Sequence, residues 1–471
     1  MPFSSTPRPE VLKSLSNVKH IPYWLDNKDR PNATEALTES TTADLCVIGA
    51  GFTGLWSALL AKETHPDLDV VLIEATETGN GASGRNGGFL DHCLTHTFEN
   101  GLERWPSEIS TLVRMGYENL DAIEDTVKRY KIDCDFQRGG EMVVATEAYQ
   151  LDNLKSASGE ARKFGYALEY LDVESTRALV NSPTYLGGLV DPNVVLVDPA
   201  RLAWGLRRAC LKNGVRLYER TVATGLENEV GDVLVRTEYG QVRAKKVALA
   251  TNAFPPLLKH LEYFIVPVYD YALMTEPLTR SQRKSIGWVK RIGLGDAGNQ
   301  FHYYRTSADG RILFGGYDAV YHWNNGFGPQ LESDTESFGR LADHFFQTFP
   351  QLEGIRFTHA WGGAIDTCSR FCAFWGMALD GRLAYAVGYT GLGVGASRFG
   401  AQVILDLLNG VDNERTRLKM VHEKPFPFPP EPFRYPIINL TRWSMDQADR
   451  NQGKRNLWLK LLDTLGLGFD T

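Results

Sequence analysis

The glycine spacing after the first apolar strand constrains the fold most. In ADLCVIGAGFTGLWSALLAKE, residues 43–63, a short apolar strand passes through Gly49, Gly51 and Gly54 directly into a helix. Gly49 permits a tight turn, Gly51 removes a Cβ where a pyrophosphate would touch the backbone, and Gly54 lets helix and strand pack closely. The free N–H groups and the positive end of the helix dipole then face the phosphates. This pattern predicts a βαβ unit that binds a dinucleotide.

A second apolar strand ends at Glu74, 20 residues after Gly54. Its carboxylate stands where an adenosine ribose is held, and its charge repels a 2′-phosphate, which argues against NADP. The fingerprint serves both NAD and FAD. A second glycine cluster, GNGASGRNGG, follows at residues 79–88, where a simple NAD enzyme would begin another helix. This cluster favours the longer FAD, because its backbone can line much of an extended dinucleotide.

A third glycine-rich turn, GYTGLGVGAS, precedes a helix near residue 395. The positive end of that helix would face the flavin N1–C2=O edge, which becomes negative when the ring takes up a hydride. The helix dipole would favour the reduced ring by about 1–2 kcal/mol.

Bulk properties exclude several function classes. A chain of 471 residues exceeds one hydrophobic core, so two or more domains are expected. The net charge of -7 offers no basic face for nucleic acid, and no apolar run is long enough to span a membrane. The six cysteines are scattered without a C-x-x-C pair, which predicts reduced thiols in a cytoplasmic protein and no metal site.

Glycine-turn segments and alternating-strand segments interleave along the chain. Alternation of apolar and polar residues is typical of half-buried antiparallel strands. We therefore predict one α/β unit from residues 41–124, 198–260 and 355–412, and a second, mainly antiparallel unit from 125–197 and 261–354. Residues 1–40 are expected to form an irregular leader docked by Tyr23 and Trp24. Residues 413–471 are expected to form a Pro-rich and then helical tail.

The order of DLCVIGAGFTGLWSA, LIEA, GASGRNGG, VDPARL, ALATNA and GYTGLGVGAS resembles the D-amino-acid-oxidase-like family of flavin amine oxidoreductases, over about residues 20–415. ASGRNGG is most similar to the branch of γ-glutamylputrescine oxidase and aminophosphonate oxidoreductase. The resemblance implies an α/β FAD-binding domain, Rossmann-like and of the glutathione-reductase type, with an inserted mainly antiparallel α+β substrate domain.

The resemblance also implies the residues that hold the cofactor, with Val222 at the adenine and residues 393–395 at the pyrimidine edge. The FAD-binding set is Gly49, Gly51, Gly54, Glu74, Ser83, Arg85, Asn86, Gly87, Val222, Gly393, Val394 and Gly395. Arg85 stands where members that attach flavin through histidine carry that histidine. Cys368 does not fall on the cysteine position of sarcosine oxidase, so the FAD is expected to be non-covalent.

The implied reaction is oxidation of the C–N bond of a small primary or secondary amine, such as an amino acid, a polyamine derivative or an aminophosphonate. Hydride transfer to flavin gives an imine that water hydrolyses. Arg305 is expected to pair with an anionic group on the amine, although a surface arginine fits the same pattern. The candidate substrate contacts are Tyr304, Arg305, Trp361 and Asp366, with Tyr303, Asp270 and Asp318 as further possibilities.

Two alternatives remain open at this point: an NAD-dependent dehydrogenase, and a flavin-binding subunit without turnover of its own. The electron acceptor is also open, as oxygen or another molecule. Sarcosine oxidase carries a lysine at each of two positions near the flavin, and this chain has Phe314 and about Gly395 there. The amine and the oligomeric state are not fixed by the sequence.

Overall fold

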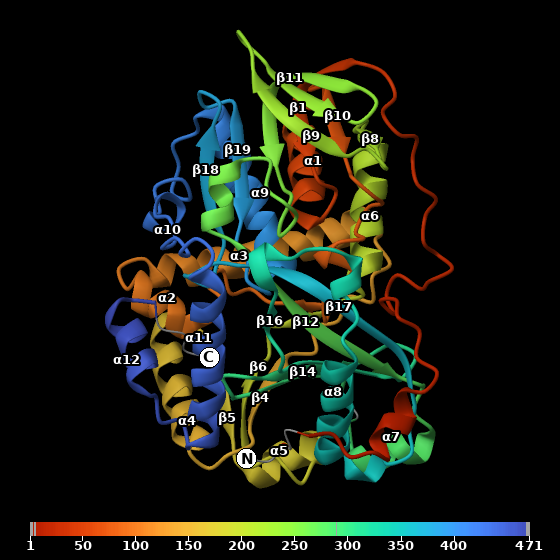
Figure 1. Ribbon diagram of the computed structural model, residues 1–471, viewed down its shortest axis with the longest axis vertical. Helices are drawn as coiled ribbons and strands as arrows, with labels where there is room; N and C mark the ends of the chain where they lie inside the picture. Colours follow the sequence, from red (N-terminus) through yellow and green to blue (C-terminus); the bar gives the residue numbers. More distant parts are fainter. Residues whose placement is uncertain (1–2, 4–5, 289, 468–471) are drawn as a thin grey trace.

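The protein, described by a computed structural model, contains two large sheets arranged along its long axis (Figure 1). The structure describes residue 3, residues 6–288 and residues 290–467. Positions 1–2 and 4–5 of the expected leader, position 289 and positions 468–471 of the expected tail lie outside the described residues. In Figure 1 the first sheet lies in the upper half of the molecule and the second sheet in the lower half.

The first sheet has eight strands, and its central strands run parallel. Its order is β18-β19-β11-β1-β2-β8, with β10 on β11 and β9 on β10. The strands are β1 (Thr41–Ile48), β2 (Val70–Ile73), β8 (Arg216–Tyr218), β9 (Ala223–Asn228), β10 (Val233–Thr237), β11 (Gln241–Leu249), β18 (Phe374–Ala378) and β19 (Leu383–Val387). These strands come from the segments predicted for the α/β unit.

Both faces of the first sheet are buried, as parallel strands require. Leu45 and Val47 of β1 pack under the helices α1 (Phe52–Thr64), α3 (Ile109–Arg129), α6 (Pro199–Lys212) and α9 (Gly393–Asn409). Cys46 and Ile48 point to the opposite face, where they pack against residues of β10 and of the segment 257–265. The parallel strands and their covering helices confirm the α/β character expected from the glycine turns.

The second sheet has nine strands and is antiparallel except where β13 meets β4. Its order is β16-β12-β15-β14-β13-β4-β6-β5, with β17 on β12. The strands are β4 (Glu141–Ala145), β5 (Glu169–Leu171), β6 (Gly187–Asp191), β12 (Val266–Thr275), β13 (Gly293–Asp296), β14 (His302–Thr306), β15 (Ile312–Gly316), β16 (Val320–Tyr321) and β17 (Phe357–Thr367). The predicted boundary at residue 355 separates β17 from the sheet that it joins, because β17 pairs with β12 along almost its whole length.

The pleat of β12 divides its side chains between two environments. Tyr269, Tyr271 and Leu273 pack into the core beneath helix α8 (Thr335–Thr348). Val268, Asp270 and Ala272 alternate with them and line a cavity on the other side of the strand. This alternation follows from the two-residue period of a strand and positions the acidic part of the site described below.

The remaining elements connect or cover the sheets. They are α2 (Phe98–Arg104), α4 (Gln150–Ala161), α5 (Val173–Leu179), α7 (Arg280–Ile286), α10 (Lys419–His422), α11 (Arg434–Arg450), α12 (Leu457–Thr464), the short pair β3 (Phe89–Leu90) and β7 (Val195–Leu196), and seven 3-10 helices: Val11–Leu15, Ala82–Gly84, Arg162–Phe164, Lys259–Tyr263, Trp323–Asn325, Pro329–Leu331 and Pro350–Leu352. Helices α11 and α12 run beside α4 along one side of the molecule (Figure 1). Trp24 of the leader is 3% exposed. All six cysteines are buried and free. Among the described helices, none combines the length and the apolar character needed to cross a bilayer.

Candidate functional site

One cavity of about 1440 Å³ is lined by residues of both sheets. Its volume exceeds the roughly 300–1000 Å³ of pockets that hold a single small ligand, so it has room for a dinucleotide and a substrate together. Gly51 and Glu74 line it from the first sheet, and Asp270 and Tyr303 line it from the second. Helix α11, which lies in the expected tail, contributes a further wall that includes Arg442.

The first glycine turn forms a cradle at one end of this cavity. Gly49 has a φ of +103°, and a Cβ on Gly54 would lie 1.8 Å from the Gly49 carbonyl oxygen. Both glycines are therefore required by the turn and its packing. A Cβ on Gly51 would approach only the Ser83 hydroxyl, at 3.0 Å, so this backbone stays open toward the cavity. Ser83 Oγ accepts a hydrogen bond from the Phe52 amide, at 2.9 Å, where α1 begins. A pyrophosphate fits this cradle.

Glu74 lines the same end of the cavity and also ties the turn together. Its carboxylate accepts hydrogen bonds from the Ala50 amide at 2.8 Å and the Thr76 amide at 2.9 Å. Burial raises the pKa of Glu74, and these hydrogen bonds oppose that rise. A carboxylate has about four acceptor positions, which leaves capacity for ribose hydroxyls. Val222 lines the cavity as well.

The carbonyls of the loop 85–88 are held by side chains from three distant parts of the chain. The donors are Trp361 Nε1 to Arg85 O (2.8 Å), Trp24 Nε1 to Asn86 O (2.9 Å) and Arg305 Nη1 to Gly88 O (3.0 Å). The Asn86 side chain closes the loop from within, because its amide donates to Ala82 O and Ser83 O and its oxygen accepts from the Gly88 amide. Hydrogen bonds within the protein therefore fix the loop that the sequence assigns to FAD.

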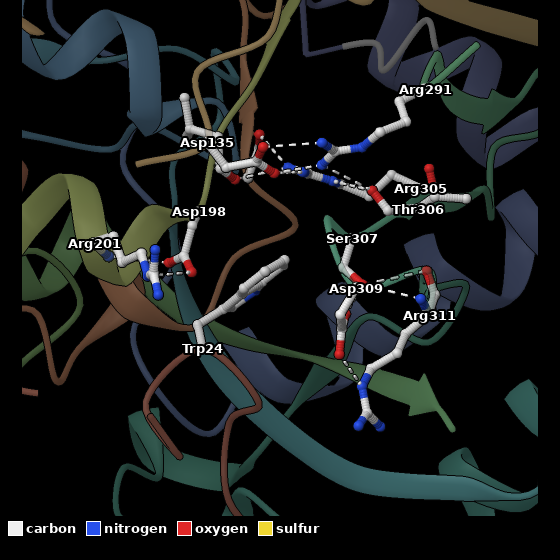
Figure 2. Close-up of polar contacts among 12 residues, drawn as sticks. Trp24, Asp135, Asp198, Arg201, Arg291, Arg305, Thr306, Ser307, Asp309 and Arg311 are labelled. Atoms are coloured by element: carbon white, nitrogen blue, oxygen red, sulfur yellow. Dashed lines mark hydrogen bonds and ion pairs between the residues drawn. The ribbon is translucent and has the colours of Figure 1, made fainter. Parts of the chain in front are cut away.

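Arg305 lies outside the cavity lining, so the structure does not place it where a substrate anion would bind. Its side chain is fully buried and donates to the Val197 carbonyl at 2.7 Å as well as to Gly88. Figure 2 shows the guanidinium near Asp135, at 3.9 Å, and close to Trp24, whose ring centroid lies 5.5 Å from the Arg305 Cζ. Burial lowers the pKa of Arg305 to about 10. Here Arg305 joins the second sheet to the cofactor loop.

Tyr304 is also absent from the cavity lining. Its side chain is fully buried in the core of the second sheet, where its hydroxyl donates to Asp296 at 3.0 Å and lies 2.9 Å from the Tyr185 hydroxyl. The neighbouring Tyr303 points to the opposite face and does line the cavity. The pleat of β14 separates these two tyrosines, and the sequence could not show which one faced the site.

Trp361, Asp366 and Arg85 all line the cavity, although hydrogen bonds occupy much of their polar capacity. Asp366 accepts a hydrogen bond from the Gly388 amide at 2.5 Å, and burial raises the pKa of Asp366 to about 6. Arg85 forms an ion pair with Glu332 at 2.7 Å. Asp366 thus holds the turn that leads to α9.

A helix follows the glycine-rich turn, as predicted, but α9 begins at Gly393, so that Gly393 and Gly395 lie in its first turn and not before it. Gly393 and Val394 line the cavity. A Cβ on Gly395 would lie 2.0 Å from the Asp91 carbonyl oxygen. Gly395 therefore lets α9 pack directly on the chain after the cofactor loop. The turns at Gly51 and Gly393 are about 340 positions apart in sequence and line one cavity.

A second acidic wall was missed by the sequence analysis. Asp91 and Glu141 line the cavity, and burial, with the charges of Asp91 and Asp191, raises the pKa of Glu141 to about 8. His92 Nε2 lies 2.9 Å from Asp191 Oδ2. Burial by itself lowers the pKa of His92. The neighbouring carboxylates of Asp191 and Asp91 raise it by more, so the pKa of His92 lies above its usual value. The side-chain atoms of Asp91, His92 and Asp191 that could coordinate a metal ion lie within 4.8 Å of one another. Only the sheet register brings β4 and β6 together here.

The chain is similar in sequence and in fold to known FAD dependent oxidoreductases and related proteins. A protein family described as FAD dependent oxidoreductase matches residues 44–407. γ-Glutamylputrescine oxidoreductase of Escherichia coli (strain K12) is 34% identical over 402 residues, covering 83% of this chain and 89% of that protein. Probable oxidoreductase OrdL of Haemophilus influenzae is 29% identical, with coverage of 83% and 89%. The crystal structure of glycine oxidase from Geobacillus kaustophilus aligns with a TM-score of 0.65 at 18% identity, covering 79% of this chain and 96% of that one.

Proposed function

The chain belongs to the family of FAD dependent oxidoreductases, and we propose that it oxidises the C–N bond of a small primary or secondary amine. The observation that carries the proposal is the single cavity that joins the two glycine turns to the carboxylate of Asp270. A relative named for γ-glutamylputrescine and a structural neighbour named for glycine support an amine as the substrate class. The match to an FAD family favours FAD over NAD.

The residues present fit FAD, because the Gly51 backbone is open to the cavity and the turn at Gly393 lies along the same space. Gly49, Gly51 and Ser83 would hold the pyrophosphate, and Glu74 the ribose. Gly87 and residues 393–395 would lie toward the ring. When bound without a covalent link, as we propose, FAD supplies a hydride acceptor. The protein's contribution is to hold the amine beside it and to exclude water.

We assign the first sheet and its helices to an FAD-binding domain of the glutathione-reductase type, and the second sheet to an inserted substrate domain. The assignment follows the segments predicted from the sequence, with β17 moved to the second domain because of its pairing with β12. Six free cysteines support the reducing cytoplasm as the compartment.

We also expect an electron-acceptor dye to be a better oxidant than oxygen. Transfer of electrons to oxygen develops negative charge, which a nearby cation stabilises. In the described part of the chain no lysine lines the cavity, and Phe314 is buried away from it. The arginines that line it are Arg85, which Glu332 neutralises, and Arg442 on α11.

Anaerobic reduction of the flavin tests the proposal. The purified yellow protein is mixed with 1,4-diaminobutane, N-methylbutylamine, glycine and sarcosine, and the visible flavin band is followed. We expect at least one amine to bleach the band and to yield the corresponding carbonyl compound and ammonia or amine. A protein that binds FAD but is reduced by none of these amines would favour a binding subunit without turnover.

A further inference from the structure

Asp270 lies on the cavity face of β12, opposite Gly363 of β17. Its carboxylate accepts hydrogen bonds from the Tyr303 hydroxyl and from the Tyr271 amide, both at 2.7 Å, and the Gly316 amide also stabilises its charged form. A carboxylate has about four acceptor positions, so these three donors leave one available to a ligand. In the described part of the chain, no ion pair joins Asp270 to a basic side chain.

Tyr303 is held in a socket made by two glycines. A Cβ on Gly315 would lie 2.7 Å from the Tyr303 hydroxyl, and a Cβ on Gly87 would lie 2.9 Å from its ring. The ring therefore fits only because both positions lack a side chain. Since Gly87 belongs to the loop assigned to FAD, the socket places the Asp270–Tyr303 pair directly beside the cofactor end of the cavity.

Asp270 differs from the two other aspartates that the sequence offered. Asp318 forms an ion pair with Arg340 and accepts a hydrogen bond from Ser337, at 2.8 Å. Asp366 accepts from the backbone amide of Gly388 and fixes its turn. The charge of Asp318 is therefore neutralised by Arg340, and the carboxylate of Asp366 is used to hold the turn at Gly388. Asp270 combines a cavity position with an unneutralised charge.

We propose that the carboxylate of Asp270, oriented by Tyr303, is the subsite that receives the ammonium group of the substrate. The proposal rests on the proposed function and names the substrate form that enters: a cationic amine. An ammonium has no lone pair to assist hydride departure, so its proton must leave first. In this step an N–H bond of the ammonium breaks, an O–H bond forms on Asp270, and the electron pair stays on nitrogen.

The electrostatics of the subsite agree with this role. Burial raises the pKa of Asp270 to about 6, and the hydrogen bond from Tyr303 limits the rise. Asp270 is thus a stronger base than an exposed aspartate, and it is ionised above about pH 6. Affinity for an ammonium should fall as the pH falls through that value. The charged and titratable groups nearest to Asp270 are Tyr303 of β14, which donates to it, and Asp318 after β15, which Arg340 neutralises. Across from Asp270 on β17, Arg85 lies beside Gly363 and pairs with Glu332. On the neighbouring strand β16, Tyr321 lies opposite Val268, and Tyr269 and Tyr271 of β12 point to the other face.

The test uses tert-butylammonium, which has no hydrogen on the carbon next to nitrogen and can bind without being oxidised. Calorimetric titration of the FAD-loaded protein gives its Kd between pH 5 and pH 8. Asp270→Asn should weaken binding about 10- to 100-fold at pH 8, as loss of a hydrogen bond to a charged group does. Tyr303→Phe, which keeps the ring in its socket, should weaken it about 5-fold. The control is Glu276→Gln, which removes a carboxylate beyond the end of β12 that pairs with Arg356.

The wild type and Glu276→Gln should both lose affinity below pH 6, while Asp270→Asn should bind weakly with no such pH dependence. Neutral tert-butanol should bind equally to all variants. Equal affinity of the wild type and Asp270→Asn for tert-butylammonium, or no binding by the wild type at millimolar concentration, would overturn this subsite. If amines still reduced the flavin in that case, the proposed function would stand without it. If tert-butylammonium bound as expected but no amine reduced the flavin, the subsite would stand and the proposed function would fall.

Discussion

The two ends of the cavity are built in different ways. At the dinucleotide end the chain offers its backbone, through the turn at Gly49–Gly51 and the helix α1 that begins at Phe52. At the amine end it offers side chains, Asp270 of β12 and Tyr303 of β14, which are 33 positions apart and come from the two strands that flank β15. A backbone site leaves a fixed glycine spacing in the sequence, whereas a side-chain site depends on sheet register and on which face of a strand each residue takes.

The largest effects on folding and on FAD content should come from the first glycine turn, where Gly54 is needed for packing and Gly51 for access to the cofactor. Gly54→Val should prevent folding, because its Cβ would lie 1.8 Å from the Gly49 carbonyl oxygen. Gly51→Val should fold and lose FAD, because its side chain would project into the cradle past Ser83. Circular dichroism and the flavin absorbance of the purified proteins separate the two outcomes. Full flavin in Gly51→Val would contradict the pyrophosphate assignment.

The next largest effect should come from Arg305, which joins the two ends. Arg305→Ala leaves the buried Val197 carbonyl without its donor and removes one of the two donors to the Gly88 carbonyl, which the Val197 amide still reaches at 2.9 Å. Together with the loss of two hydrogen bonds from a charged group, this should lower the unfolding free energy by about 3–5 kcal/mol. The variant should therefore have a lower Tm and less bound FAD. Trp24→Phe, which removes one donor to the same loop, should lower the Tm less. A normal Tm with a raised KM for anionic amines alone would restore Arg305 as a substrate anchor.

The smallest effect should come from Arg442 on α11, outside the family match. Arg442 lines the cavity, and no described carboxylate pairs with it. If the amine carries an anionic group, Arg442→Ala should raise its KM about 5- to 10-fold, as expected for a partly exposed ion pair of about 1 kcal/mol. Amines with a neutral tail should be unaffected. An equal change for both kinds of amine would show that α11 shapes the cavity without selecting charge.

Much of the cofactor end of the cavity could be predicted from the sequence, and little of the amine end. The first sheet, its helices and the cofactor turns were predictable, because Gly51, Glu74 and Gly393 lie in local patterns that each carry a reason. Arg305 was interpreted as a substrate anchor because the pattern of β14 could not reveal that its guanidinium reaches back to the cofactor loop. The wall from Asp91 and Glu141 was not found, because nothing local to either residue indicates their proximity.

The C-terminal tail is a second region whose long-range contacts the sequence did not reveal. Its Pro-rich stretch and helices are predicted as a tail outside the two units, yet Arg442 and Trp458 line the cavity. Amphipathic spacing predicts that a helix has a buried face but does not say which surface covers that face.

In the arrangement that we propose, one cavity holds FAD on the glycine turns and an amine on Asp270. The most direct test is a crystal structure of the FAD-loaded protein soaked with tert-butylamine. We expect the pyrophosphate against the Gly51 backbone and the ammonium nitrogen within hydrogen-bond distance of the Asp270 carboxylate, beside the Tyr303 hydroxyl. An amine bound instead at Asp91 and Glu141, with Asp270 bonded only to donors of the protein, would contradict this arrangement.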